Sequence, residues 1–507
     1  MLWVTLSIVI ATIVFIKLLL SVRDILRERT AVKKLPCPPG VHWLTGHTKL
    51  DPFGAGFQWL RDTVKVCPRA YVIWNGPLAL PVLVHPETIK PLVSSSKHAK
   101  KSVLYKVFED WVGLGLVTSS GAHWKRNRRL LTASFHMDVL RTHIPVFNKC
   151  TDVLLEKLDR IATQKAPMSV YHELSLCTFD IILRAAFSFE SNVQNRGPLQ
   201  DGKYDMLHAT EVLSRVSQTR MVSSNPLVIH PLTFKFTSVY SDWAKATQFV
   251  HNFANGLIIK RTDELETKMK SEDPLTKPRD FLDTILMARD SDGTGLSVQE
   301  LTDEACTFLF AGFETTATTL TWLLYALAKY PEHQDKVRDE VDEILSGRDS
   351  DRIMSNDFVL MEYMTRVIKE TIRLYNTAVL LSRTLTEPLD VDGVTLPTGT
   401  TVAVNLYQLH HNPTVWGEDH MEFKPSRFLP ENFNKMDPFA FIAFSAGPRN
   451  CIGQQFALNE MKLMVARLVS RFRLGLVEGE LEPVPTLYIT IKPQKELMLS
   501  IEKRERI

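Results

Sequence analysis

Residues Phe444 to Gly453 read Phe-Ser-Ala-Gly-Pro-Arg-Asn-Cys-Ile-Gly, and this stretch decides how the whole chain is interpreted. It places Cys451 directly before a predicted helix, where backbone N–H groups and the helix dipole favour the thiolate over the thiol. Gly447 and Gly453 would let the loop pass close to a flat macrocycle, and Arg449 offers a cation suited to a carboxylate. The stretch therefore predicts that Cys451 is a strongly electron-donating ligand.

The helix after this loop is indicated by Ala457, Met461, Met464 and Leu468, which are spaced so that they share one face. A simpler interpretation exists for Cys451 alone, because an arbitrary free cysteine is more often a buried small hydrophobe. That interpretation leaves the surrounding glycines, proline and arginine unexplained, so we favour the ligand.

The longest predicted helix starts at the capping box Ser297 to Glu300 and ends at Tyr330, before Pro331. At 1.5 Å per residue its length is about 50 Å. Its middle, Ala305 to Leu327, is apolar nearly all round, which is typical of a helix in the centre of a large protein.

A carboxylate lies inside this apolar run, in the sequence Ala311-Gly312-Phe313-Glu314-Thr315. A buried carboxylate is unfavourable unless it is hydrogen-bonded, reaches water or stays protonated. Glu314 could simply be held by a neighbouring side chain, with the Thr315 hydroxyl bonded to a carbonyl one turn earlier. Gly312 favours a functional interpretation, because a glycine inside a helix often marks the close approach of a ligand or another backbone.

Helical patterns dominate from His42 onward, and strand-like runs are confined to Tyr71 to Trp74, Pro81 to Val84 and Leu389 to Val402. We predict a mainly α fold with small β-sheets, in which residues 41–507 form one domain. The net charge of +3 does not suit a nucleic-acid binder. The six cysteines lie far apart, which suits a reducing compartment and neither a zinc site nor a disulfide framework.

Residues 1–22 are predicted to be a transmembrane anchor, because Leu2 to Val22 is apolar apart from Lys17 and long enough to span a bilayer. A basic and proline-rich linker, residues 23–40, follows, and its positive charge is expected to stay in the cytosol. A cleaved signal peptide is the alternative, but a positive start and a clear cleavage site are missing.

The loop around Cys451 resembles the haem-binding motif of the cytochrome P-450 superfamily, with phenylalanine, glycine, arginine, cysteine and glycine at the expected spacing. The resemblance covers essentially the whole chain after the anchor. Finer features at residues 111–116, 410–413 and 444–456 resemble the clan of fatty-acid ω-hydroxylases. The resemblance implies a haem-thiolate monooxygenase with a large helical fold, haem b and Cys451 as the axial ligand of the iron.

The same resemblance implies roles for further residues. Glu314 and Thr315 would deliver protons, so that they form the catalytic set together with Cys451. Contacts to the haem are implied for Trp124, Arg128, Arg383, Phe444, Gly447, Arg449, Cys451 and Gly453. A buried network behind the haem is implied for Glu370, Arg373 and Arg427, which as a bare pattern would predict only an exposed ion pair of little effect.

Two departures from the family matter. Many members of the clan carry, in place of Ala311, a glutamate that forms an ester bond to the haem. Ala311 cannot form this bond, so non-covalent haem is expected and strict terminal selectivity is weakened. The second departure is the segment Tyr375 to Thr377, where the family commonly has prolines, and which leads toward the substrate pocket.

No flavin or nicotinamide fingerprint is present, so electrons must come from another protein. The expected donor is an NADPH-dependent haemoprotein reductase of the endoplasmic reticulum membrane, with cytochrome b5 as a second candidate partner. We also hypothesise that Lys125, Arg126 and Arg129 steer this acidic donor to the cysteine side of the haem. A solvated charged surface is the alternative for each of them.

The expected substrate is a lipophilic molecule, such as a fatty acid or eicosanoid hydroxylated at or near its ω carbon. Retinoids, sterols and foreign compounds are alternatives within the same superfamily. Two other classes are a haem-thiolate isomerase or dehydratase that acts on peroxides, and a non-catalytic haem carrier or sensor. Glu314 and Thr315 disfavour both, because neither class needs an acid and alcohol relay.

Overall fold

A computed structural model of the chain describes residues 26–42, 45–47, 54–76, 78–195, 205–223, 225–270, 280–290 and 293–504, with residues 5, 12, 15, 16 and 23 before them. Most of the predicted anchor, residues 1–22, lies outside the described residues. Among those that are described, no helix combines the length and apolar character needed to cross a membrane.

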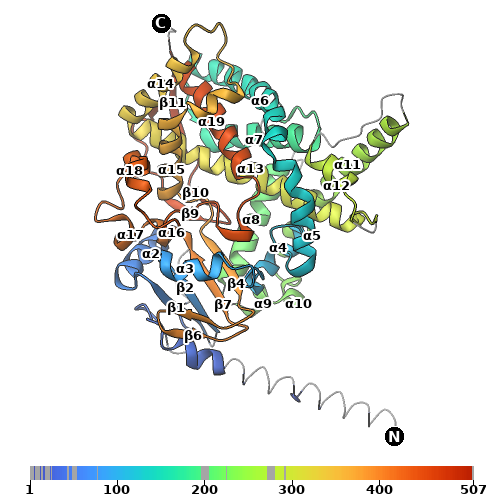
Figure 1. Cartoon of the computed structure of the whole chain (residues 1–507). Coiled ribbons are helices and arrows are strands. Elements are labelled where there is room, and N and C mark those ends of the chain that lie inside the picture. Colours follow the sequence, from blue (N-terminus) through green and yellow to red (C-terminus); the bar gives the residue numbers. More distant parts are fainter. Residues whose placement is uncertain are drawn as a thin grey trace.

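Helices make up most of the described chain, so the predicted mainly α fold is confirmed (Figure 1). They are α2 (Gly54–Val66), α3 (Pro86–Val93), α4 (Lys106–Val112), α5 (Gly121–Thr132), α6 (Met137–Thr163), α7 (Val170–Phe187), α8 (Met206–Val222), α9 (Pro226–Ile229), α10 (Pro231–Phe234), α11 (Tyr240–Met269), α12 (Phe281–Met287), α13 (Val298–Lys329), α14 (Pro331–Leu345), α15 (Glu362–Leu374), α16 (Leu406–His410), α17 (Pro413–Trp416), α18 (Pro430–Phe433) and α19 (Gln454–Arg471).

The strands are short and form four small sheets. They are β1 (Ala70–Asn75), β2 (Leu78–Leu83), β3 (Met168–Ser169), β4 (Leu380–Thr384), β5 (Leu389–Val391), β6 (Val394–Leu396), β7 (Thr401–Asn405), β8 (Phe472–Leu476), β9 (Pro485–Leu487), β10 (Ile491–Pro493) and β11 (Met498–Lys503).

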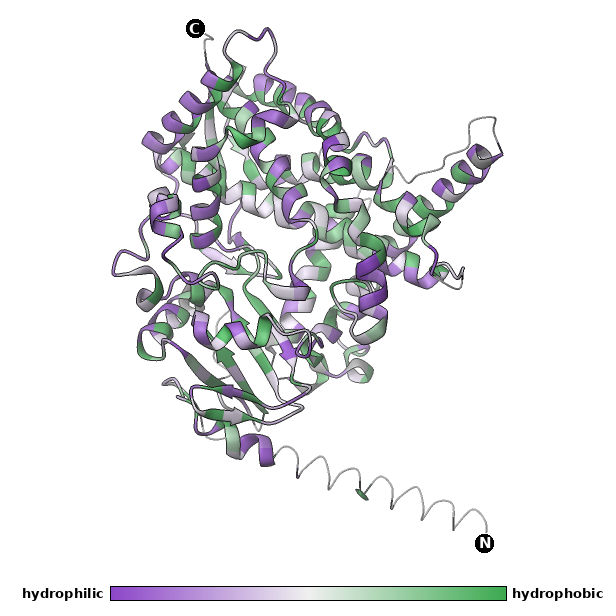
Figure 2. Cartoon of the chain, in the orientation of Figure 1, coloured by the Kyte–Doolittle hydropathy of each residue, from purple (hydrophilic) through white to green (hydrophobic). Residues whose placement is uncertain are grey.

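Helix α13 is the centre of the helical part, as its sequence predicts. Ser297 and Glu300 form the expected capping box, and the helix ends one residue before its C-cap, Tyr330. Trp322 and Leu324 are fully buried, and α7 lies along α13 for much of its length. Figure 2 shows hydrophobic residues gathered toward the interior of the helical part and hydrophilic ones on its outer helices. The core therefore forms around this helix.

The largest sheet has the strand order β1, β2, β7, β4 and lies at the opposite end of the molecule from α14 (Figure 1). β1 and β2 form an antiparallel hairpin, and β2 pairs in parallel with β7. Residues 26–32 are helical beside this sheet. Val32 and Leu35 of the predicted linker are buried in the same apolar cluster as Val72 and Val402.

The region from Leu389 to Val402, where strand-like runs were predicted, holds β5, β6 and the start of β7. The chain turns at Asp392 and Gly393, which both have positive φ, so β5 and β6 form a separate hairpin before β7 begins. An Asp-Gly pair is a strong hairpin signal, because both residues tolerate the left-handed region. The strands at the C-terminal end, β8 to β11, were not predicted. They are short, and β8 pairs with β11 rather than with a neighbour in sequence.

Candidate functional site

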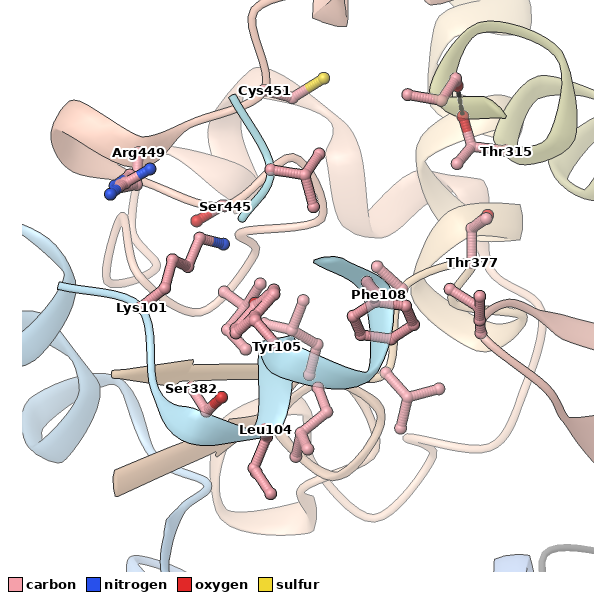
Figure 3. A pocket seen from close by; sticks show the side chains of 18 of the residues that line it. Lys101, Leu104, Tyr105, Phe108, Thr315, Thr377, Ser382, Ser445, Arg449 and Cys451 are labelled. Carbon is pink, nitrogen blue, oxygen red and sulfur yellow. Dashed lines mark hydrogen bonds between the residues drawn. The ribbon is translucent and has the colours of Figure 1, made fainter. Parts of the chain in front are cut away.

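A cavity of about 840 Å³ extends between the large sheet and α13. Its walls come from the loop before α19, from the middle of α13, from α4 and from strands β2 and β4. Figure 3 shows Cys451 at one edge of the pocket, with Lys101 and Arg449 on one side and Thr315 and Thr377 on the other. The structure thus brings together residues that are far apart in the sequence.

Cys451 borders this cavity and ends the loop that enters α19. Its backbone N–H donates to the carbonyl of Phe444 at 2.8 Å, which closes the loop. Arg128 of α5 reaches the same loop and donates to the backbone carbonyl of Asn450 at 3.0 Å and to its side-chain oxygen at 2.8 Å. The loop is therefore fixed at Asn450 and at Cys451 itself.

The pKa of the Cys451 thiol is raised, because burial outweighs the N–H of Gly453 and the charge of Arg128, which both lower it. The sequence argument identified the backbone N–H contribution but neither Arg128 nor the burial, so the loop by itself does not favour the thiolate. A metal ion that binds the sulfur displaces its proton regardless of that preference.

The three glycines of the site have different surroundings. At Gly447, φ is +66° and a Cβ would lie 2.2 Å from the carbonyl oxygen of Val93, so the close approach is to the end of α3 and not to a macrocycle. At Gly312, a Cβ would meet the Ile182 side chain of α7 at 2.5 Å, so the predicted ligand approach is a helix contact. Only at Gly453 is the space open, with Phe135 at 3.9 Å as the nearest neighbour.

Lys101 and Arg449 border one side of the cavity and form a cluster of cations with the nearby Arg383. Burial and the charges of the two arginines hold the pKa of Lys101 well below its usual value. Burial, and then Arg383, lowers the pKa of Arg449 to about 9. Arg449 also lies 3.8 Å from the ring centroid of Trp124. Among the described residues this cluster has no acidic partner, so it is suited to an anionic ligand.

Lys101 was missed in the sequence, because a lysine after Lys97 and Lys100 looks like part of an exposed charged run. The other two cations were predicted, and Arg449 is held by the backbone carbonyls of Ala99 at 2.9 Å and Ser119 at 2.7 Å. No feature of the local sequence separates Lys101 from its neighbours.

Glu314 and Thr315 point to different surroundings. Thr315 borders the cavity, and its hydroxyl donates to the carbonyl of Ala311 at 2.9 Å. Glu314 is buried and accepts hydrogen bonds from Tyr171 at 2.6 Å and Thr490 at 3.0 Å. It also forms an ion pair with Lys492 at 2.7 Å. Both residues therefore make the structural contacts that the sequence analysis gave as the alternative. Glu314 is held by neighbouring side chains, and the Thr315 hydroxyl bonds to a carbonyl one turn earlier.

Glu370, Arg373 and Arg427 lie together behind the cavity. Arg373 of α15 is fully buried and donates two hydrogen bonds to Glu370, at 2.7 and 2.8 Å. Its remaining N–H groups donate to the carbonyls of His410, His420 and Glu422. The Arg427 Nε lies 3.4 Å from a Glu370 oxygen. The three residues are thus brought into one network that joins α15 to the segment before the cysteine loop.

The segment after α15 reaches the cavity, as expected. Tyr375 stacks on Trp322 with ring centroids 4.5 Å apart, and the hydroxyl of Thr377 lies 2.6 Å from that of Thr319. Thr377 and Ala311 both border the cavity. A hydroxyl, and not a proline ring, therefore lines this part of the wall.

The three basic residues proposed to steer a redox partner do not act alike. Arg126 forms ion pairs with Asp290 and Glu300, so its charge is balanced within the chain. Arg129 is more exposed, yet it also pairs with Asp290 at 3.1 Å. Lys125, one turn before Arg129 on α5, is exposed. The side-chain partners of Arg126 lie too far along the chain to be recognised from the sequence.

The residues around the cavity fit a haem group. A flat macrocycle with two propionates would carry negative charge that matches Lys101, Arg383 and Arg449, while Cys451 would offer a sulfur ligand and Gly453 leaves the space before α19 open. A mainly helical fold with this combination of thiol and cations defines the class of haem-thiolate proteins.

Comparisons with known proteins agree with this class. The family model for Cytochrome P450 matches residues 36–500. Leukotriene-B4 omega-hydroxylase 3 of Mus musculus is 33% identical over 99% of this chain and 95% of its own length. Cytochrome P450 4Z1 of Homo sapiens is 36% identical over 94% and 93%, and the ultra-long-chain fatty acid omega-hydroxylase of Homo sapiens is 37% identical over 87% and 83%. The chain belongs to the cytochrome P450 family.

The protein is therefore a cytochrome P450 monooxygenase that acts on a lipophilic substrate. Its cofactor is haem b, and a reductase supplies the electrons.

Proposed function

We propose that this monooxygenase hydroxylates long-chain fatty acids or eicosanoids at or near the ω carbon. The observation that carries the proposal is the cavity, whose inner wall of Phe108, Phe310 and Leu381 is apolar and leads to Thr315 beside the cysteine loop. Such a wall suits an alkyl chain whose end reaches the reacting side. Relatives named as ω-hydroxylases of leukotriene B4 and of ultra-long-chain fatty acids support the same class.

The test is to incubate the reconstituted enzyme, reductase and NADPH with a panel of fatty acids, eicosanoids, retinoids and sterols. Terminal or near-terminal alcohols of the acids are expected as the main products. Turnover of retinoids or sterols alone would contradict the proposal. Product formed from a fatty-acid hydroperoxide without NADPH would point instead to an isomerase or dehydratase.

We propose that Cys451 is the axial ligand of the haem iron and that Trp124, Arg128, Arg383 and Arg449 hold the propionates. Lys101 joins this set because its buried charge has no acidic partner among the described residues. When bound, haem supplies the activation of O2 and the insertion of one oxygen atom into a C–H bond. Phe444, Gly447 and Gly453 give the cysteine loop its shape next to the macrocycle.

We also propose that Thr315 passes protons to the oxygen side of the haem and that Glu314 supports this step. Thr315 borders the cavity, whereas Glu314 does not and is bound by Tyr171 and Lys492. Both charges of the pair are buried, with Glu314 1% and Lys492 9% exposed. Glu314 would therefore exchange protons only when its contact with Tyr171 or Lys492 opens.

The haem is held without a covalent bond in this proposal, because Ala311 offers a methyl group where an ester would need a carboxylate. Extraction with acidified organic solvent should release the haem completely into the organic phase. Haem that stays with the protein would contradict this assignment.

We propose that residues 1–22 anchor the enzyme in the endoplasmic reticulum membrane, that residues 23–40 connect the anchor to the domain 41–507, and that this domain faces the cytosol. The reductase would dock on the cysteine side of the haem, near Lys125 and Arg129 of α5. Cytochrome b5 is a second candidate for this surface. Reversal of both charges should slow reductase-supported turnover at low salt, and an unchanged rate would refute the docking site.

A further inference from the structure

Four cations border the cavity within the described part of the chain, and they lie in two places. Arg449 belongs to the cysteine loop, Arg128 donates a hydrogen bond to the loop at Asn450, and Lys101 lies close enough to Arg449 for the two charges to interact. Arg29 is the fourth, and it comes from the helical residues 26–32 beside the large sheet (Figure 1). The first three are accounted for by the haem, and Arg29 is not.

The geometry of Arg29 suits the binding of an anion. Its guanidinium carbon lies 5.0 Å from the ring centroid of Trp74, at the end of β1. Arg29 is half-buried, and none of the ion pairs of the described residues involves it. A guanidinium stacked on an aromatic ring keeps its edge N–H groups free, and these donors match the two oxygens of a carboxylate.

The wall between Arg29 and the cysteine loop is apolar. Beside Trp74, the cavity is bordered by Ala79 of the β1–β2 hairpin and by Leu381 of β4. Trp74, Ala79 and Leu381 all pack against the same apolar cluster. The wall continues to Thr377, which Figure 3 draws on the same side of the pocket as Thr315. A chain with one charged end and a long apolar body fits this sequence of surfaces.

We propose that Arg29, stacked on Trp74, binds the carboxylate of a long-chain fatty acid at the outer end of the cavity and so directs the other end of the chain toward the haem. This inference rests on the proposed fatty-acid hydroxylase function and adds the residue that recognises the acid. It also explains how a protein without an ester-linked haem selects carbons near the ω end.

Glu28 borders the same end of the cavity and has the opposite effect. Burial raises the pKa of its carboxyl group, yet whenever this group is ionised it repels a carboxylate bound at Arg29. Replacement by glutamine removes the repulsion and keeps the shape of the side chain. Glu28 therefore provides a second variant whose expected effect is opposite in sign to that of Arg29.

The experiment compares hexadecanoic acid with its methyl ester as probes of the holoenzyme, in detergent solution and in phosphatidylcholine vesicles. Kd is measured from the substrate-induced shift of the haem spectrum, and KM and product positions are measured with reductase and NADPH. The variants are Arg29→Gln, Glu28→Gln and, as a matched control, Arg27→Gln, which replaces an exposed arginine of the same helical segment that does not border the cavity.

Arg29→Gln should raise Kd and KM for the acid by about 10- to 100-fold, leave the ester within twofold, and spread the product over more carbons of the chain. Glu28→Gln should bind the acid more tightly, and Arg27→Gln should resemble the wild type.

Three results would overturn the inference. They are acid binding that does not change in Arg29→Gln, equal losses for acid and ester, and a loss seen only in vesicles, which would assign Arg29 to lipid phosphates. Acid binding by the wild type that is independent of Arg29 overturns this inference alone. A wild-type enzyme that binds neither probe overturns the proposed function as well.

Discussion

The buried ion pair of Arg373 and Glu370 allows a quantitative prediction for the variant Arg373→Ala. Both side chains are completely excluded from solvent and form two hydrogen bonds with each other. Removal of one partner of such a pair costs about 3 to 5 kcal/mol, because the buried Glu370 carboxylate then keeps only the Arg427 Nε, 3.4 Å away, as a cationic partner. Three backbone carbonyls also lose their donor, at about 1 kcal/mol or more each.

The sum is comparable with the whole free energy of unfolding of a typical protein, about 5 to 15 kcal/mol. Arg373→Ala should therefore accumulate with little intact haem-thiolate spectrum. Arg373→Lys keeps the charge but cannot form the bidentate contact, so it should fold with a lower urea midpoint. The double variant Glu370→Leu with Arg373→Met should recover part of the loss, because both charges of the pair are removed and Arg427 keeps its ion pair with Asp419.

The control is Lys97→Ala, which breaks an ion pair with Glu387 whose side chains are 67% and 43% exposed. An exposed pair contributes about 0 to 1 kcal/mol, so this variant should unfold close to the wild type. The assay is urea unfolding followed by tryptophan fluorescence, together with the fraction of protein that shows the reduced, carbon monoxide-bound haem-thiolate spectrum. If Arg373→Ala unfolded within 1 kcal/mol of Lys97→Ala, the reasoning about the buried network would be refuted.

Three further predictions concern other parts of the structure. Burial raises the pKa of the Glu304 carboxyl group to about 7 in the folded protein, from 4.5 in the unfolded chain. Between pH 4.5 and 7 the folded protein therefore binds a proton that the unfolded chain has released, and stability is lost as the pH rises through this range. Relative to Glu304→Gln, the wild type should lose about 2 to 3 kcal/mol between pH 5 and 8 in urea unfolding, and parallel pH profiles would contradict this. Gly447→Ala should destabilise more than Gly479→Ala, because both have positive φ but only the first Cβ meets a backbone carbonyl, at 2.2 Å; equal unfolding midpoints would count against that contact. Thr315→Ala should lower the amount of product formed per NADPH consumed several-fold. Thr321→Ala, which changes a buried threonine outside the cavity wall, should leave this ratio unchanged. An equal ratio in the two variants would refute the role of Thr315 in proton delivery.

Features encoded over a few neighbouring residues were predictable from the sequence. The capping box at Ser297 and Glu300 and the apolar run behind it sufficed to place α13 within one residue at each end. The loop around Cys451 was likewise recognised from consecutive residues, Phe444 to Gly453. Strands such as β8 were missed, although its buried Phe472 and Leu474 alternate with exposed positions. Their pairing depends on a partner nearly thirty residues later, which local reasoning does not include.

The site was predictable to the extent that its residues sit in motifs. Glu314 was recognised as unusual, but Tyr171 and Lys492, which bind it, lie on α7 and β10 and carry no local signal. Lys101 was hidden in a basic run, and the acidic partners of Arg126 were not recognised because they are distant in sequence. In each case the charge of a side chain was visible, whereas its partner was fixed only by the fold.

The central claim is that the Cys451 sulfur binds the haem iron as a thiolate, and the absorbance spectrum of the reduced, carbon monoxide-bound protein tests it most directly. The wild type should show the strongly red-shifted Soret band of thiolate-ligated haem, and Cys451→Ala should lose it while other free cysteines, such as Cys306, remain. A wild type without this band, or a Cys451→Ala variant that retains it, would contradict the account.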